Sequence, residues 1–226
     1  MCGRYSLHSN PSVVALQFGL AHPPEFHARY NIAPGTPVLV VRADSNHARS
    51  GALLHWGLVP SWAKDPAIGS RLINARAETL TEKPSFRVAF RRRRCIVPAN
   101  GYYEWMPTNG RKQPYYIHPQ GEELFGFAAI YEHWNGPEGP LESCAIITTE
   151  ANELMRPIHQ RMPAILPIES YAHWLDPDSP DPTSLTKLLR PAAPGRIAAH
   201  PVNLRVNNVR NEGPALIERN TQQQLI

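Results

Sequence analysis

The sequence is poor in lysine and cysteine. Only 4 of its 23 basic residues are lysine, and its three cysteines, Cys2, Cys95 and Cys144, form no CxxC pair. Disulfide-stapled secreted domains carry an even cysteine framework, so this pattern predicts a protein of the reducing cytoplasm. No HExxH motif or Cys/His cluster with metal-ligand spacing occurs either, and we therefore expect no metal and no cofactor.

Long apolar runs are also missing. No stretch approaches the ~20 apolar residues that span a bilayer, and the first residues, MCGRYSLHSN, lack the apolar core of a signal peptide. We therefore expect no membrane partner. Proline, in contrast, is abundant, with 24 of 226 residues scattered between apolar runs, where it is typical of loops and strand ends.

The charge balance is basic, with a net charge of +4 and a pI of about 9.1. Arginine supplies 19 of the 23 basic residues. Because the guanidinium group offers a planar donor fork that suits phosphates, a nucleic-acid partner is allowed. A GC-rich coding sequence would explain the same arginine content without any binding role.

Short apolar segments that resemble strands dominate the middle of the chain, without regular alternation of strand and helix. This pattern predicts an α+β protein with a single domain over residues 1–226, in which a curved, largely antiparallel β-sheet or barrel carries peripheral helices. The expected strands are 37–41, 53–59, 95–98, 102–106, 115–118, 124–130, 143–149, 162–166 and 197–202. The expected helices are 12–20, 74–83, 169–175 and 183–189, with one or two helical turns at 150–155.

Cys2 is the first candidate for chemistry. Removal of Met1 would leave a thiol and a free α-amine on adjacent carbons, with ordinary pKa values of about 8.5 and about 7.7–8.0. The amine can act as a base for thiol attack on an amide. Alternatively, the amine condenses with an aldehyde and the thiol closes a five-membered thiazolidine ring, a step favoured because it is intramolecular. Cysteine at position two is also common without any function.

Three further segments hold candidate catalytic side chains. Asn74 in LINARAE can orient a substrate oxygen, although a helix N-cap is the more common role for such a residue. Glu104 lies in the aromatic segment GYYEW and is a candidate general acid or base, the alternative being an exposed carboxylate on the solvated face of a strand. His159 in IHQRMP can transfer protons, although an isolated histidine is more often structural.

Other residues suit contact with DNA. Trp62 lies in the proline-flanked segment WGLVPSWAK, where an exposed aromatic ring can stack on bases. Arginines can follow a phosphate backbone, although runs such as RRRR at 91–94 are usually only a solvated face. The arginines considered are Arg4, Arg71, Arg76, Arg87, Arg91, Arg92, Arg93, Arg94 and Arg161.

Taken together and in order, these segments resemble the SRAP (SOS response-associated peptidase) family of abasic-site processing proteins. The resemblance spans essentially the whole chain. The matching segments are MCGRY at the start, RYNIAPGTPVLVV from Arg29, WGLVPSWAKD from Trp56, LINARAET from Leu72, RRCIVPANGYYEW from Arg93, IHQRMPAILP from Ile158 and HPVNLRVNNVRNEGPALIE from His200.

The resemblance implies a monomeric enzyme that crosslinks itself to abasic sites in single-stranded DNA during the DNA damage response. It implies Cys2 as nucleophile, with Asn74, Glu104 and His159 as its catalytic partners. The DNA contacts that it implies are Arg4, Asn31, Pro34, Trp62, Arg76 and Arg161, to which we add Arg71. The peptidase name would then describe self-removal of Met1, a step that an aminopeptidase can equally supply, and the Schiff base gives lyase-type chemistry.

One departure from the family pattern is visible, because some relatives carry adjacent tryptophans where this chain has Trp62 followed by Ala63. We expect the protein to lie in the cytoplasm, associated with the nucleoid if its source is bacterial. Two other functions stay open. One is a class II glutamine amidotransferase-like amidohydrolase, whose members also begin Met-Cys-Gly, and the other is a noncovalent single-stranded DNA binding module.

Overall fold

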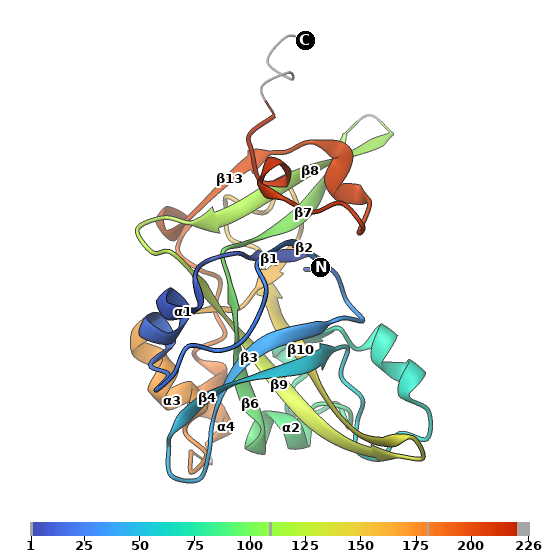
Figure 1. Cartoon of the computed structure of the whole chain (residues 1–226), viewed down its shortest axis with the longest axis vertical. Helices are drawn as coiled ribbons and strands as arrows, with labels where there is room; N and C mark the ends of the chain where they lie inside the picture. The colour runs from blue at the N-terminus through green and yellow to red at the C-terminus, as the bar shows by residue number, and fades with distance from the viewer. Residues whose placement is uncertain (1, 109, 180, 221–226) are drawn as a thin grey trace.

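A closed ring of five strands forms the centre of the molecule. The computed structural model describes residues 2–108, 110–179 and 181–220 (Figure 1). Hydrogen bonding runs from β10 through β4, β3, β6 and β9 and back to β10, with the β4–β10 pair parallel and the other ring pairs antiparallel. The ring strands are β3 (Pro37–Ala43), β4 (Arg49–Trp56), β6 (Arg94–Ala99), β9 (Phe125–Gly136) and β10 (Gly139–Glu150).

A second, antiparallel sheet lies against one end of this barrel, in the upper half of Figure 1. Asn100 alone separates β6 of the barrel from β7 of the sheet, so the chain passes directly from one to the other. The sheet order is β13–β8–β7–β1–β2. Its strands are β1 (Tyr5–Leu7), β2 (Arg29–Ile32), β7 (Gly101–Thr108), β8 (Arg111–Pro119) and β13 (Ile197–Pro201).

Three short strands extend the barrel where β10 ends. β5 (Asn74–Arg76) runs parallel to β10, and β11 (Arg161–Pro163) pairs antiparallel with the last residues of β10. β12 (Ile165–Leu166) pairs with β9. The candidate residues carried by β5 and β11 are therefore held at one end of the barrel by a single long strand.

Short helices cover the outside. Asn10 caps the N-terminus of α1, because its side chain accepts a hydrogen bond from the N–H of Ser12. The helix ends at Gly19, whose φ of 66° lies in the left-handed region that favours glycine. The α-helices are α1 (Pro11–Phe18), α2 (Arg87–Arg92), α3 (Tyr171–Leu175) and α4 (Pro182–Thr186). The 3-10 turns are η1 (Pro66–Arg71), η2 (Ala77–Thr79), η3 (Ile168–Ser170), η4 (Pro194–Arg196), η5 (Leu204–Asn207) and η6 (Pro214–Leu216). No helix among the described residues is long and apolar enough to cross a membrane.

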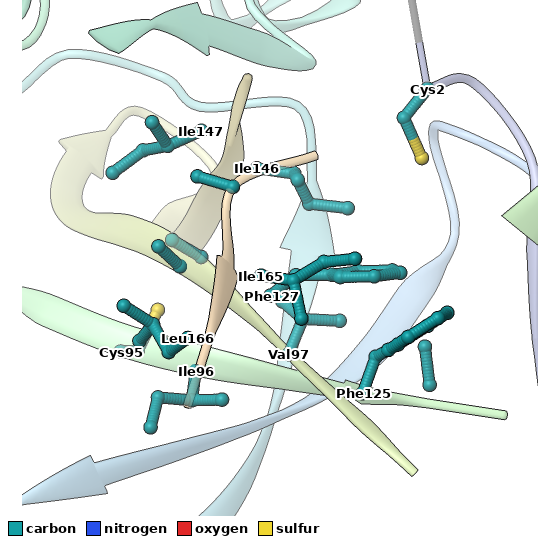
Figure 2. Close-up of a cluster of buried hydrophobic side chains, with 14 of the residues drawn as sticks. Cys2, Cys95, Ile96, Val97, Phe125, Phe127, Ile146, Ile147, Ile165 and Leu166 are labelled. Carbon is teal, nitrogen blue, oxygen red and sulfur yellow. The ribbon is translucent and has the colours of Figure 1, made fainter. Parts of the chain in front are cut away.

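One apolar core fills the barrel and continues toward the second sheet. β-Branched and aromatic side chains dominate it, as is usual for strands. Figure 2 shows part of this core, with Cys2 at its edge and Phe127 and Ile146 within it. The start of the chain is thus packed against the barrel rather than left in solvent.

The expected fold class is confirmed: strands dominate, the barrel is curved and mainly antiparallel, and the helices are peripheral. The helix expected at 74–83 is wrong, because residues 74–76 form β5 against β10 and only η2 follows. Asn74 is therefore not a helix N-cap. The strand expected at 162–166 is divided at Ala164, where the chain changes partner from β10 to β9. Strands β1 and β2 were not expected.

The arginine run at 91–94 is not one surface patch. Arg91 and Arg92 are exposed at the end of α2, whereas Arg93 donates to Glu132 at 2.7 Å. Arg94 is only 5% exposed and donates to main-chain carbonyls, including that of Trp174 at 2.8 Å. Half of the run therefore holds α2 and α3 onto the barrel.

Candidate active site

The first residues of the chain run along β7. β1 pairs antiparallel with β7, and the pairing continues past β1 because the N–H of Tyr103 donates to the carbonyl of Arg4 at 2.9 Å. Continued in the same register, the pairing puts Gly3 opposite Glu104, so Cys2 lies one residue beyond that position. The Glu104 carboxylate accordingly acts on the Cys2 thiol electrostatically. One strand pairing thus joins two candidate residues that lie about a hundred positions apart.

The Cys2 thiol is held in its protonated form. Cys2 has no exposed surface, and burial raises the pKa of its thiol far above the ordinary range, with the nearby Glu104 carboxylate raising it further. Thiolate attack is therefore disfavoured in this environment. The other two cysteines lie in the barrel, where burial raises the pKa of Cys144 to about 12 and that of Cys95 well above its ordinary value.

Asn74 anchors the main chain of Cys2. Its place on β5 is set by the parallel pairing with β10, in which it lies opposite Ile146. From there its Nδ2 donates to the Cys2 carbonyl at 2.8 Å. Its Oδ1 is buried and accepts no hydrogen bond from any residue that the structure describes. The Asn74 amide thus holds Cys2 through Nδ2, while its Oδ1 remains next to that contact as a buried hydrogen-bond acceptor.

Glu104 lies inside the protein, because it is only 3% exposed. The alternative of a solvated carboxylate on the outer face of the strand is therefore wrong. Tyr102 lies two residues earlier on β7 and faces the same side. Burial raises the pKa of the Tyr102 hydroxyl, and the nearby Cys2 and Glu104 raise it further. Cys2, Tyr102 and Glu104 therefore form one buried group.

His159 stands at the end of a tight turn that leads into β11. The N–H of Arg161 donates to Nδ1 of His159 at 2.9 Å. The same Nδ1 lies 3.1 Å from the carbonyl oxygen of Arg161, so the main chain of Arg161 fixes the ring through this nitrogen. The orientation of the ring is therefore set before a molecule binds in the pocket.

A pocket of about 390 Å³ brings Glu104 and His159 together. Three further residues line it, namely Trp105, Lys112 and Asn207. The Trp105 indole donates through Nε1 to Oδ1 of Asn207 at 2.7 Å, which fixes the plane of its ring. Sequence reasoning missed these three residues. Lys112 could have been found from the Asn-Gly pair at 109–110, which is typical of a hairpin that would fold Lys112 back toward Trp105.

Two of the expected DNA contacts lie near the end of β10. Arg76 is exposed on β5, two residues beyond Asn74 and on the same face. Arg161 donates to both carboxylate oxygens of Glu78 at 2.7 and 2.9 Å and to the carbonyl of Thr148 at 2.7 Å. The hydrogen bonds from Arg161 lower the pKa of Glu78. The Arg161 guanidinium is thus fixed in place before any ligand binds.

Two other expected contacts join the ends of the chain. Asn31 has no exposed surface, and its Oδ1 accepts from Nη1 of Arg4 at 2.7 Å. Its Nδ2 donates to the carbonyls of Asn208 and Asn211 at 3.0 and 2.9 Å. Arg4 also donates to the carbonyl of Val206 at 2.9 Å. Both side chains hold the C-terminal segment in place, and their contact with DNA stays a prediction.

The remaining expected contacts lie outside the pocket that Glu104 and His159 line. Trp62 is 58% exposed and lines a separate pocket of about 370 Å³ together with Arg71. This loop is tied to the other end of β10, because Nε1 of Trp134 donates to the carbonyl of Ala63 at 2.7 Å. Pro34 is half-buried in the turn between β2 and β3.

One cluster of the described residues has the spacing of metal ligands. His47, Asp176 and Asp178 bring one ligand atom each to within 4.8 Å of one another. His47 and Asp178 are exposed, and none of the three lines the pocket of Glu104 and His159. The expectation that the protein uses no metal stays a prediction.

Comparison with known proteins begins with protein families. The model of the family described as "SOS response associated peptidase (SRAP)" matches residues 1–209. The chain belongs to the SRAP family. The match includes every candidate catalytic residue, so the family resemblance seen in the ordered sequence segments is confirmed.

Two bacterial relatives within the SRAP family are similar over nearly their full length, and a vertebrate relative is similar over about two thirds of its length. The chain is 46% identical to the abasic site processing protein YoqW of Bacillus subtilis, covering 96% of this chain and 99% of YoqW. It is 41% identical to the abasic site processing protein YoaM of the same organism, over 96% of this chain and 98% of YoaM. It is also 38% identical to the abasic site processing protein HMCES of Gallus gallus, over 84% of this chain and 65% of HMCES.

Solved structures share the fold of this SRAP chain. A protein from Bacteroides thetaiotaomicron aligns with a TM-score of 0.87 at 28% identity, over 97% of this chain and all of that one. A phage-related protein from Bordetella bronchiseptica aligns with a TM-score of 0.73 at 30% identity, over 89% of this chain and 94% of that one. The barrel and its attached sheet are therefore shared architecture.

Proposed function

We propose that this protein captures the aldehyde of an abasic site in single-stranded DNA and holds it through Cys2 as a covalent thiazolidine. One arrangement carries the proposal. Asn74 anchors the main chain of Cys2, and Glu104 lies beside its thiol, in a chain whose full-length relatives are named abasic site processing proteins. A stable crosslink would shield the lesion from strand breakage during the DNA damage response.

The order of the steps follows from the protonation of Cys2. Removal of Met1 frees an α-amine, a group whose ordinary pKa is about 7.7–8.0, whereas burial raises the pKa of the Cys2 thiol. The amine therefore attacks C1′ first and gives a carbinolamine, which loses water to form a Schiff base. The thiol then adds to the imine carbon, and its proton passes to the nitrogen. One aldehyde and one aminothiol give one thiazolidine and one water, so no oxidant or reductant is needed.

Each partner has a role that its position allows. Asn74 orients the amine, because its buried Oδ1 can accept an N–H from Cys2 while Nδ2 holds the carbonyl. Glu104 supplies and removes the protons of dehydration. His159, which lines the same pocket as Glu104, passes a proton to an oxygen of the deoxyribose and so assists ring opening. Fast closure by the thiol then prevents β-elimination from the Schiff base.

DNA would approach from the end of the barrel that carries Arg76 and Arg161. Both lie within one or two residues of a catalytic candidate on the same strand or turn, so their guanidinium groups suit the phosphates beside the reacting sugar. Trp62 would stack on a base further along the strand. All five residues of the pocket belong to one chain, and we propose that a monomer acts.

The test is incubation with single-stranded DNA that contains one abasic site, followed by denaturing electrophoresis and intact mass. We expect a covalent species whose mass equals protein plus DNA minus one water, and none from Cys2→Ala. A protein that keeps an extra residue ahead of Cys2 should form no thiazolidine, because its α-amine is on the wrong carbon. A crosslink of equal yield from Cys2→Ala would refute the proposal.

The unaltered protein and Cys2→Ala also distinguish the proposed function from the two alternative functions. An amidohydrolase would release ammonia from glutamine, which the protonated thiol of Cys2 disfavours. A noncovalent binding module would bind single-stranded DNA equally well with Cys2 or alanine and would leave no species after denaturation. Glutaminase assays and native binding assays on the same two proteins therefore decide between the three functions.

A further inference from the structure

Lys112 occupies a position that the proposed chemistry does not use. It lies on β8 opposite Pro107 of β7, diagonal to Trp105, on the same face of the hairpin. Its side chain lines the pocket that also holds Glu104 and His159. Lysine side chains are long enough to reach across such a diagonal. A cation is therefore placed at the rim of the candidate active site.

The Lys112 ammonium group has no ion pair or hydrogen bond with any residue that the structure describes. Arg161 differs, because its guanidinium is paired with Glu78. The carboxylate in the same pocket, Glu104, is buried and acts electrostatically on the Cys2 thiol. An unpaired cation at a pocket rim favours an anionic ligand.

Asn207 adds a second donor on the same side of the pocket. Its Oδ1 accepts the indole N–H of Trp105 at 2.7 Å, which fixes the amide and leaves its NH₂ group as a donor. Trp105 is held from its other side by the Arg4 guanidinium, 5.8 Å from the ring centroid. Lys112 and Asn207 thus flank a rigid ring, whereas His159 lines the pocket from the β11 side.

We infer that Lys112, with the Asn207 amide, binds one of the two phosphates that flank the abasic sugar. This inference rests on the proposed function. An abasic nucleotide keeps both of its phosphates, and among the residues that line the pocket Lys112, next to Trp105, is the lysine or arginine. A strand bound with one phosphate at Lys112 places its sugar over Glu104. Lys112 therefore sets the position and direction of the strand and takes no part in the bond-forming steps.

The experiment compares Lys112→Ala with Arg111→Ala. Arg111 is the matched control, because it is the preceding basic residue of the same hairpin, is exposed and does not line the pocket. Crosslinking rates are measured against the concentration of an abasic single-stranded oligonucleotide at several salt concentrations. Free 2-deoxyribose, which has the aldehyde but no phosphate, is measured alongside by intact mass.

For Lys112→Ala we expect the half-saturating DNA concentration to rise about five-fold at 0.1 M salt. Losing one phosphate contact to single-stranded DNA makes the fall of log affinity with log salt less steep by about 0.7, and the expected rise in half-saturation corresponds to this change. Lys112→Arg should restore most of the affinity, because the charge returns. Reaction with 2-deoxyribose should match the unaltered protein, and Arg111→Ala should change half-saturation by less than about two-fold.

Three outcomes would overturn the inference. The first is an unchanged half-saturation in Lys112→Ala, and the second is an equal loss in Arg111→Ala, which would indicate only general charge. The third is a slower reaction of Lys112→Ala with 2-deoxyribose, which would place the lysine in the chemistry. Failure of the unaltered protein to crosslink any abasic DNA would instead refute the proposed function, so the two failures are distinguishable.

Discussion

Removal of the Asn74 side chain tests how Cys2 is held for reaction. In Asn74→Ala the 2.8 Å hydrogen bond to the Cys2 carbonyl is lost, and a buried carbonyl oxygen loses a partner. Such a loss costs about 1–3 kcal/mol. If this free energy is lost from the transition state, crosslinking slows by about 5- to 150-fold, since each 1.36 kcal/mol is a factor of ten.

The assay is single-turnover crosslinking at saturating abasic DNA, so that binding does not enter the rate. Because Asn74 lies on a strand held by main-chain bonds to β10, we expect the fold to survive, and urea unfolding checks this. The rate at saturation should fall while half-saturation changes little, because Asn74 orients the amine and does not hold the DNA.

The matched control is Asn100→Ala, at the opposite end of β1 from Cys2. Its amide also makes buried hydrogen bonds, accepting the N–H groups of His8 and Ser9 at 2.7 and 3.0 Å. We expect a loss of stability similar to that of Asn74→Ala but an unchanged crosslinking rate. A wild-type rate for Asn74→Ala, or an equal rate loss in Asn100→Ala, would refute the assigned role of Asn74.

Other substitutions test the framework around the site. Gly101→Ala should lower the unfolding free energy by about 1–3 kcal/mol in urea titrations, because its Cβ would lie 2.4 Å from Cζ of Tyr116. Asn31→Ala should cost about 2–4 kcal/mol, since the hydrogen bonds of this buried side chain to Arg4, Asn208 and Asn211 are lost, and should expose residues 203–212 to limited proteolysis. Glu78→Gln should be less stable at neutral pH. Its folded pKa is lowered by Arg161, so the difference from wild type should shrink as pH falls below the ordinary glutamate value of 4.5.

The sequence predicts the strands of the barrel well, because their apolar and β-branched runs are both local and periodic. It does not predict β1, β2 or β5, which are three or four residues long. Such short strands exist through pairing with a distant partner, as β5 does with β10. The prediction of a helix beginning at Asn74 was wrong for this reason. Asn74 is a residue type that often caps helices, but here it lies on β5, paired with β10.

Like the fold, the candidate site contains some residues that the sequence indicates and others that only the structure brings together. Residue types that carry chemistry mark Cys2, Asn74, Glu104 and His159, and all four lie in short ordered segments that resemble the family. Asn207 carries no such mark, because one asparagine among many is ordinary, and Lys112 is indicated only by the Asn-Gly pair before it, which is typical of a hairpin. Their positions in the pocket follow from the β7–β8 pairing and from the fold of the C-terminal segment.

The hydrogen bond between Arg4 and Val206 joins residues 202 positions apart. During synthesis, the residues that carry the aminothiol are therefore made first, while those that fasten them are made almost last. Closing so long a separation is slow compared with forming local contacts. A growing chain that has not reached Val206 can pair β1 with β7 and place Asn74 at Cys2, but Arg4 and Asn31 then lack their partners in the C-terminal segment. That segment is therefore the last part of the framework around Cys2 to form.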